Sequence, residues 1–336
     1  MLKKTSVFSL TNRMMSTRPK IYITRPDYHV EGTDLLKQEC DVTNWSTACP
    51  VPRSELLENI SGKSGLFCSL TDKIDKEVLD KAGPQLKVVS TISVGYEHID
   101  IAECKKRNIR VGYTPDVLTD ATAELTVALL LATNRRLFEA NKQVYNGGWK
   151  SWAPSWMCGN GIKGSVIGVY GFGRIGQEVA SRIKPFKPAR LIYNSRTEKH
   201  NDIGAEFVGF EELVKNSDIL IVCCALTADT KEMFNKSVFE KMKPGSIFIN
   251  TARGGVVNQK DLYEALKNNT IQSAGLDVTT PEPLPLDDPL LSLSNVVILP
   301  HIGSADINTR TEMSRIAACN ILAALRGGEM IAEVKS

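Results

Sequence analysis

Short apolar runs alternate with amphipathic stretches along most of this chain. In the first third, the stretches with helical spacing include residues 73–82 and 101–106, which we expect to be helices. The apolar runs are expected to be short buried strands at residues 21–23, 65–70, 86–92 and 109–113. Strands that alternate with helices in this way predict a parallel sheet and therefore an α/β fold.

A second alternation begins at Ser165, and a final helical pattern covers residues 308–325. Between the two alternations, one long helical pattern runs from Thr119 to about Ala140 and is long enough to connect two lobes. The chain has 336 residues, so two domains of roughly 150 residues each are expected. The strands of the second alternation are expected at residues 166–170, 191–193, 219–224, 246–250, 274–278 and 296–299.

A GxGxxG motif, formed by Gly171, Gly173 and Gly176, lies directly after the first of these strands and directly before a helical pattern. The motif alone is weak evidence, but strand, glycines and helix in this order are typical of a dinucleotide-binding turn. Gly171 permits the tight turn, Gly173 lets a pyrophosphate approach the backbone, and Gly176 lets helix and strand pack closely. The amides that open the helix, including those of Arg174 and Ile175, can bind the phosphates.

Three chemically different side chains follow the last three strands of the second alternation. Arg253 follows the fourth strand, Glu282 the fifth and His301 the sixth. In open α/β sheets, ligands bind outside the carboxyl ends of the strands. Any one of these residues alone would more often be structural, whereas all three beside a nucleotide-binding turn indicate an active site.

Composition and charge exclude several classes of function. The net charge is +3, from 41 basic and 38 acidic residues, which argues against a nucleic-acid or polybasic membrane partner. No apolar run is long enough to cross a bilayer. The eight cysteines form neither a CxxC pair nor a zinc spacing, so we expect no metal site and a reduced intracellular chain.

The N-terminus allows two interpretations. Residues 1–26 carry six basic side chains and no acidic one before Asp27, which is the composition of a mitochondrial presequence. The alternative is a short tail ahead of the first strand. We expect a cytoplasmic protein, with a mitochondrial one as the alternative.

From Pro19 to Val334 the chain resembles the D-isomer-specific 2-hydroxyacid dehydrogenases. Within that family it is most similar to the animal enzymes that reduce glyoxylate and hydroxypyruvate. The stretches that carry the resemblance are SVGYEHID at 93–100, GYTPDVLTD at 112–120, NGGW at 146–149, GFGRIG at 171–176, NTARG at 250–254, AGLDVTTPEPL at 274–284 and LPHIGS at 299–304.

The resemblance implies a role for each candidate residue. His301 corresponds to the catalytic acid/base, Glu282 to its carboxylate partner, and Arg253 to the residue that binds the substrate carboxylate and polarises the carbonyl. Val94 and Gly95 match the loop whose backbone amides hold the other end of that carboxylate. The remaining implied cofactor contacts are Leu226, Thr251, Asp277 and Gly303.

The chemistry of these side chains agrees with the resemblance. Reduction of a 2-oxo acid needs a hydride on carbon and a proton on oxygen. A histidine can give that proton near neutral pH, and a neighbouring carboxylate stabilises and orients the charged ring. A planar Arg fork suits the substrate carboxylate.

The resemblance also implies two Rossmann-like domains with a cleft between them. A flavodoxin-like substrate-binding domain would consist of residues 19–118 and 307–336, and a doubly wound dinucleotide-binding domain of residues 119–306. Residues 1–18 would be a disordered or targeting tail.

The family works as a homodimer held by an arm of the nucleotide-binding domain. Here that arm would include residues 146–160, with Trp149, Trp152 and Trp156. The alternative is that these tryptophans fill the core of their own domain.

The cofactor preference is predicted from the end of the second strand of the nucleotide-binding domain. An NAD-specific site usually places an acidic residue there to bind the ribose 2′-hydroxyl. Here Ser195, Arg196 and Thr197 follow that strand, with no acidic residue before Glu198. These side chains suit a 2′-phosphate, so NADP(H) is expected to be preferred, with NAD(H) possible.

The expected function is therefore NADPH-dependent, reversible reduction of glyoxylate to glycolate and of hydroxypyruvate to D-glycerate. One alternative is a 3-phosphoglycerate-type dehydrogenase, which expects an acidic residue after the second strand and often a further regulatory domain. Another is a dinucleotide-sensing transcriptional corepressor, which can retain the same Arg, Glu and His.

Overall fold

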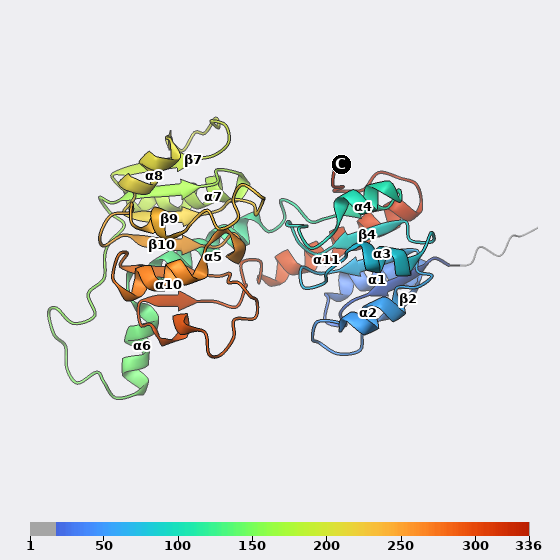
Figure 1. The fold of residues 1–336 in the computed structure, drawn as a ribbon, viewed down its shortest axis with the longest axis horizontal. Coiled ribbons are helices and arrows are strands. Elements are labelled where there is room, and N and C mark those ends of the chain that lie inside the picture. Colours follow the sequence, from blue (N-terminus) through green and yellow to red (C-terminus); the bar gives the residue numbers. More distant parts are fainter. Residues whose placement is uncertain (1–17, 336) are drawn as a thin grey trace, which may run out of the picture. The chain divides into compact units, whose positions relative to one another are not determined.

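The computed structural model describes residues 18–335, which divide into two compact units. Unit 1 contains the described residues up to Tyr113 and from Ser314 onward, and unit 2 contains Thr114–Met313. The domain boundaries that we expected from the sequence, after residues 118 and 306, lie a few residues from these unit boundaries. The predicted α/β class is confirmed, because each unit is built on a sheet of parallel strands (Figure 1).

The described residues of unit 1 form a five-stranded sheet in the order β2-β1-β3-β4-β5, which is the flavodoxin-like order. Its strands are β1 (Lys20–Ile23), β2 (Asp41–Asn44), β3 (Gly65–Cys68), β4 (Val88–Thr91) and β5 (Arg110–Gly112). The accompanying helices are α1 (Val30–Glu39), α2 (Arg53–Asn59), α3 (Lys76–Ala82), α4 (Ile101–Lys106) and the part of α11 (Ile307–Leu325) that follows Met313.

Alternation along β1 divides the core of unit 1 into two layers. Tyr22 faces a cluster with residues of α2 and α3, while Ile21 and Ile23 face a cluster that includes Ala317 and Ile321 of α11. Both faces of the sheet are therefore covered, as parallel sheets require. One face depends on residues from the far end of the sequence.

The C-terminal segment extends this sheet. Glu333 forms an antiparallel bridge with Gly112 of β5, and its carboxylate accepts two hydrogen bonds from the Arg110 guanidinium, at 2.8 and 2.5 Å. The bidentate ion pair and the backbone bridge together fix the end of the chain against the edge strand.

In the described structure, unit 2 has a seven-stranded sheet in the order β12-β11-β10-β9-β6-β7-β8. Counted from β6, this is the doubly wound Rossmann order, with the change of direction between β6 and β9. The strands are β6 (Val166–Tyr170), β7 (Arg190–Asn194), β8 (Glu206–Phe207), β9 (Ile219–Val222), β10 (Ile247–Asn250), β11 (Ser273–Leu276) and β12 (Val296–Ile298). The α-helices are α5 (Thr119–Asn134), α6 (Leu137–Tyr145), α7 (Arg174–Ile183), α8 (Phe210–Asn216), α9 (Lys236–Phe239) and α10 (Gln259–Lys267).

The long helix predicted from Thr119 to about Ala140 is wrong in one respect. The structure has two helices, because Arg136 adopts a left-handed conformation with φ of +54° and ends the helical path of α5. The Arg136 guanidinium then binds the Glu139 carboxylate in the first turn of α6, at 2.9 and 2.7 Å. No glycine or proline marks this break, so the apolar spacing looks continuous in the sequence.

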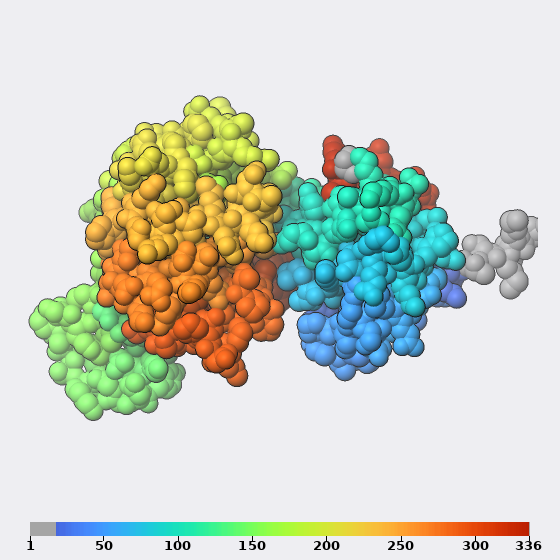
Figure 2. Space-filling model, in the orientation of Figure 1, coloured from blue at the N-terminus to red at the C-terminus, as the bar shows by residue number. Residues whose placement is uncertain are grey.

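After the break, α6 and the segment that follows it extend away from the sheet of unit 2 (Figure 1). Figure 2 shows residues 135–160, in light green, as a protrusion from the body of this unit. Trp149, Trp152 and Trp156 are 58, 82 and 40% exposed, so none of them fills a core of this chain.

Among the described residues, no helix combines the length and the apolarity that crossing a membrane would need.

Candidate active site

The glycine motif forms the turn from β6 into α7. Gly171 has a φ of +92°, and a Cβ there would lie 2.6 Å from the backbone nitrogen of Cys224. A Cβ on Gly176 would lie 2.1 Å from the Gly171 carbonyl oxygen, whereas one on Gly173 would meet nothing within 4 Å. The outer glycines are thus required by packing, and the middle one keeps its approach open for a ligand.

The start of α7 fits a pyrophosphate. Gln177 donates the first backbone hydrogen bond of the helix, to the Gly173 oxygen at 3.0 Å, so the amides of Arg174, Ile175 and Gly176 have no intrahelical acceptor. The Arg174 side chain forms an ion pair with Asp116, which has a left-handed φ of +70°. This ion pair is a feature that the sequence did not indicate.

The end of β7 carries the residues predicted to select the cofactor. The Arg196 side chain is exposed there. Ser195 Oγ donates to the Thr197 carbonyl at 2.7 Å, and the amide of Lys199 donates to the Tyr193 hydroxyl at 2.8 Å. These bonds make a closed turn in which Ser195 stabilises the loop, and Arg196 projects from it as a cation.

Arg253 lies three residues beyond β10 in a backbone held from both sides. Asn250 Nδ2 donates to the Arg253 carbonyl at 3.0 Å, and Asn250 Oδ1 accepts from the Ala252 amide at 3.0 Å. A Cβ on Gly254 would lie only 1.9 Å from the Thr279 carbonyl oxygen, so glycine is required for this close approach to the segment after β11. Arg253 is thereby placed next to the loop that carries Glu282.

Glu282 and His301 form a direct pair. His301 Nδ1 lies 2.7 Å from Glu282 Oε2, and the other carboxylate oxygen accepts the Thr279 amide at 3.0 Å. The two side chains are 24 and 30% exposed. Because the carboxylate accepts, Nδ1 carries the hydrogen, and Nε2 is left as the ring atom that can exchange a proton with a substrate.

Asp277 supports the backbone around His301. Its carboxylate oxygens accept the amides of Ile302 and Gly303, both at 2.8 Å, and its own carbonyl accepts the His301 amide at 2.9 Å. Burial raises the pKa of Asp277, while the two amides and the neighbouring His301 act in the opposite direction. His301 itself has a left-handed φ of +53°, so this capping holds an uncommon backbone conformation.

The structure places the other predicted contacts as follows. Thr251 shares a hydrogen bond of 2.8 Å with Thr126, and Leu226 lies beside Gly255. Val94 and Gly95 belong to unit 1, where they follow the carboxyl end of β4.

In the described residues, no three His, Cys, Asp or Glu side chains are grouped as metal ligands would be.

One positioning side chain was missed by sequence reasoning. Gln259, in the first turn of α10, accepts the Thr280 amide at 2.9 Å and donates to the Asp288 carboxylate at 2.8 Å. It therefore ties both ends of the loop that carries Glu282. A glutamine at the start of a helix gives no signal of this contact, because its partners lie more than twenty residues away in the sequence.

The arrangement is that of a nucleotide-binding turn and an Arg, Glu and His set on neighbouring strands of one Rossmann sheet. Residues 127–303 match the family described as "D-isomer specific 2-hydroxyacid dehydrogenase, NAD binding domain". The chain belongs to the D-isomer specific 2-hydroxyacid dehydrogenase family. Its members are NAD(P)-dependent oxidoreductases, and the family match lies within unit 2.

Relatives in this family cover nearly the whole chain. A Mus musculus protein named glyoxylate reductase/hydroxypyruvate reductase is 52% identical over 94% of this chain and 98% of its own length. The crystal structure of a Thermus thermophilus protein matches with a TM-score of 0.88 and 41% identity, over 94% of this chain and all of that one.

A further match contains a bound cofactor. The NADPH-dependent glyoxylate/hydroxypyruvate reductase of Sinorhizobium meliloti, solved with NADP and malonate, has a TM-score of 0.82 and 31% identity, over 95% of this chain and 97% of that one. The expected recognition of the family is confirmed by these matches.

Proposed function

We propose that this 2-hydroxyacid dehydrogenase is a reductase of glyoxylate and hydroxypyruvate that prefers NADPH. The observation that carries the proposal is the 2.7 Å pair of His301 Nδ1 and Glu282 Oε2, which follow the two strands next to the one that precedes Arg253. The names of the relatives support the choice of substrates. Unit 2 would bind the dinucleotide and unit 1 the substrate.

In this proposal, the bound nicotinamide supplies the hydride to the carbonyl carbon. Arg253 binds the substrate carboxylate with its planar fork, and the Val94 and Gly95 amides hold the same group. His301 donates a proton from Nε2 to the carbonyl oxygen, while Glu282 stabilises the ring's charge before that transfer and fixes its orientation. The reverse steps oxidise a D-2-hydroxy acid.

The direct test is NADPH consumption, followed by absorbance, with glyoxylate or hydroxypyruvate as substrate. Turnover of both substrates supports the proposal. Turnover of a phosphorylated three-carbon acid instead would favour the 3-phosphoglycerate-type alternative. Dinucleotide binding without turnover of any 2-oxo acid would favour the corepressor alternative.

Arg196→Ala is expected to raise KM for NADPH by at least about tenfold and to leave NADH use nearly unchanged. The exposed guanidinium at the end of β7 would pair with the 2′-phosphate, which NADH lacks. KM for each cofactor at saturating hydroxypyruvate is the measurement. Arg190→Ala, at the opposite end of the same strand, is the control and should change neither value. A wild-type enzyme that favours NADH in kcat/KM would contradict the cofactor proposal.

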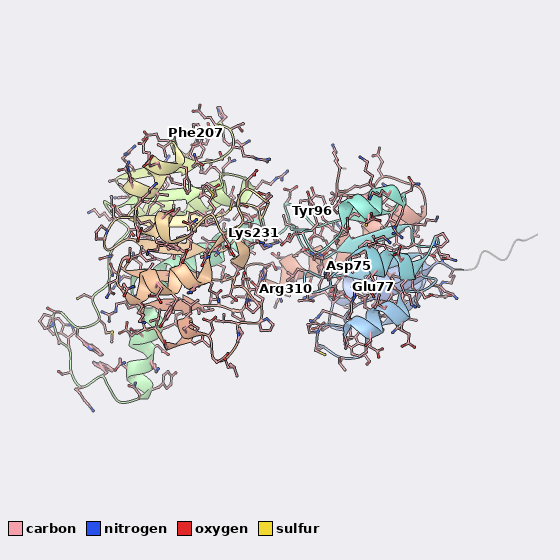
Figure 3. The ribbon with its side chains drawn as sticks, in the orientation of Figure 1. Asp75, Glu77, Tyr96, Phe207, Lys231 and Arg310 are labelled. Carbon is pink, nitrogen blue, oxygen red and sulfur yellow. The ribbon has the colours of Figure 1, made fainter. Side chains whose placement is uncertain are left out.

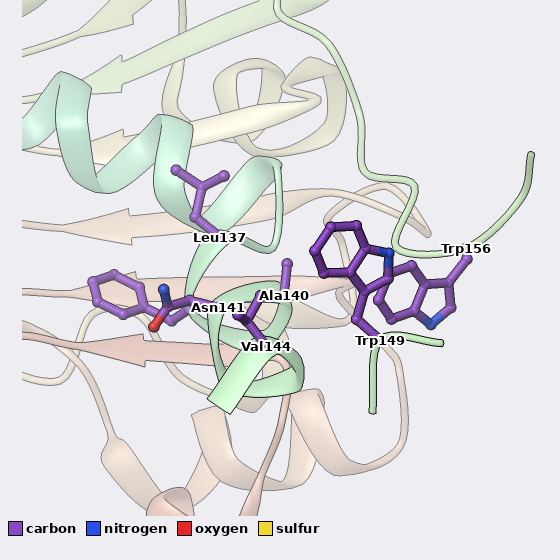
Figure 4. A pocket seen from close by; sticks show the side chains of 7 residues that line it. Leu137, Ala140, Asn141, Val144, Trp149 and Trp156 are labelled. Atoms are coloured by element: carbon purple, nitrogen blue, oxygen red, sulfur yellow. The ribbon is translucent and has the colours of Figure 1, made fainter. Parts of the chain in front are cut away.

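We also propose that the protein is a homodimer whose contact surface is the protrusion of residues 135–160. There an apolar groove is lined by side chains of α6 and by two of the tryptophans: Leu137, Phe138, Ala140, Asn141, Val144, Trp149 and Trp156 (Figure 4). Leu137 and Phe138 are more than half exposed. Exposed apolar and aromatic side chains that are grouped in this way are typical of protein–protein interfaces.

Light scattering at micromolar concentration is expected to give twice the chain mass of 37.0 kDa. Phe138→Asp should shift the protein to the monomer, because it places a charge on the lining of the apolar groove. Val30→Asp is the control, since Val30 is equally exposed at 60% but lies at the start of α1 in unit 1. A wild-type monomer, or dissociation by the control alone, would contradict this interface.

The cytoplasmic location, and its mitochondrial alternative, stay predictions. Of the six basic residues that suggest a presequence, Lys3, Lys4 and Arg13 lie outside the described residues, whereas Arg18, Lys20 and Arg25 lie within them.

A further inference from the structure

The end of β4 and the loop that follows it contain a row of hydrogen-bonded polar groups. His98 Nε2 lies 3.0 Å from Thr91 Oγ1, Thr91 Oγ1 lies 2.8 Å from Ser93 Oγ, and Ser93 Oγ donates to the Gly95 carbonyl at 2.7 Å. Thr91 is completely buried and Ser93 is 4% exposed. Buried hydroxyls aligned in this way need a structural or functional reason.

The direction of the hydrogens in this chain is fixed by its last member. The Gly95 carbonyl can only accept, so the single hydroxyl hydrogen of Ser93 points to it. Ser93 Oγ then accepts the hydroxyl hydrogen of Thr91, and Thr91 Oγ1 in turn accepts Nε2–H of His98. His98 is therefore the first donor of a row of hydrogen bonds that ends at the Gly95 carbonyl.

The hydrogen bonds of His98, Thr91 and Ser93 end beside the two backbone amides that are assigned to the substrate carboxylate. The bond from Ser93 Oγ to the Gly95 carbonyl closes a short ring of backbone, and the amides of Val94 and Gly95 lie within that ring. Neither amide donates a hydrogen bond to any residue between 18 and 335. Both are thus available for an anion at the carboxyl end of a parallel strand, where ligands bind.

The far side of the loop is held independently. The His98 carbonyl accepts the Ile74 amide at 2.8 Å, the Ile74 carbonyl accepts the Asp100 amide at 2.9 Å, and Asp100 caps α4. The backbone of His98 is thus held by its contact with Ile74. Through the hydrogen bond of its ring, residues 93–95 are linked to this fixed segment. Tyr96, which Figure 3 labels, continues the loop and packs edge-on against Tyr113.

We propose that His98 is a positioning residue, which through Thr91 and Ser93 holds the Val94 and Gly95 amides in the orientation that binds the substrate carboxylate. The inference rests on the proposed function, because it deepens the role given there to these two amides. His98 acts through other residues and does not take part in proton transfer.

The test is steady-state kinetics of His98→Ala, Thr91→Val and the double variant, with glyoxylate and hydroxypyruvate. Each single variant is expected to raise KM for both substrates by about tenfold, the effect of weakening one charge-assisted hydrogen bond, with kcat within about twofold of wild type. The double variant should be no worse than either single one, because both break the same chain. His98→Gln, which keeps an N–H donor at similar reach, should restore much of the lost affinity.

Ser90→Ala is the matched control. Ser90 is also completely buried on β4, but its hydroxyl makes no hydrogen bond within the described part of the chain, so KM should stay unchanged. Partial unfolding lowers the active fraction and hence kcat, but it does not raise KM. Unchanged KM in both single variants, additive effects in the double variant, or a fall in kcat alone would overturn the inference. A wild-type protein that reduces neither substrate would instead overturn the proposed function.

Discussion

Replacing His301 by alanine is expected to lower kcat for hydroxypyruvate by about 10²–10⁴-fold while leaving NADPH affinity nearly intact. The ring is the only imidazole paired with a carboxylate at the carboxyl edge of the described sheet of unit 2, and its Nε2 is the atom left to give a proton. Its backbone is held by Asp277, so loss of the ring should leave the loop in place. Single-turnover kinetics with NADPH and cofactor fluorescence titration measure the two quantities.

Added imidazole provides an independent check on this prediction. If the missing group is a proton donor, free imidazole should restore part of the activity of His301→Ala, with a dependence on pH that follows its protonated form. Wild-type-like kcat in the variant, or a matching loss of NADPH binding, would mean that His301 does not have the proposed role.

Arg253→Lys is expected to raise KM for hydroxypyruvate by about 10²-fold and to lower kcat as well. Lysine keeps the positive charge but loses the two parallel N–H donors that match a carboxylate. The structure allows no compensation by backbone movement, since Asn250 and the contact of Gly254 with Thr279 hold the segment on both sides. The measurement is kcat and KM over a wide range of substrate concentration.

Arg190→Lys is the control for this variant, because Arg190 lies at the opposite edge of the same sheet and pairs with Glu206 on the surface. It should behave as wild type. A KM in Arg253→Lys within error of the wild-type value would show that Arg253 does not hold the carboxylate.

The sequence located the candidate site because parallel strands bring their carboxyl ends to one edge. Arg253, Glu282 and His301 could be assigned to that edge by counting strands, whereas the pairing of Glu282 with His301 was implied only by the family resemblance. The sequence could not predict which hydrogen bonds hold the loops at this edge of the sheet in place. Asp277 reaches amides 25 and 26 residues away, and Gln259 bridges residues 21 and 29 positions away, and such contacts leave no periodic signal.

Apolar spacing missed two edge strands and one helix break. β2 and β8 are exposed or half-buried edge strands, so they lack the apolar runs by which buried strands are found. In Figure 3, Phe207 of β8 lies at the outer edge of its sheet. The break at Arg136 depends on one backbone angle and one local ion pair, which apolar spacing does not record.

The covering of the unit 1 sheet by α11 has a consequence for synthesis on the ribosome. Ile21 and Ile23 of the first strand pack in one cluster with Ala317, Ala318 and Ile321, which are translated after the whole of unit 2. Unit 2, by contrast, is one uninterrupted stretch that can collapse as soon as it emerges. Until the whole of unit 2 has been translated, the newly made N-terminal strands must therefore leave exposed the part of this apolar face that α11 covers.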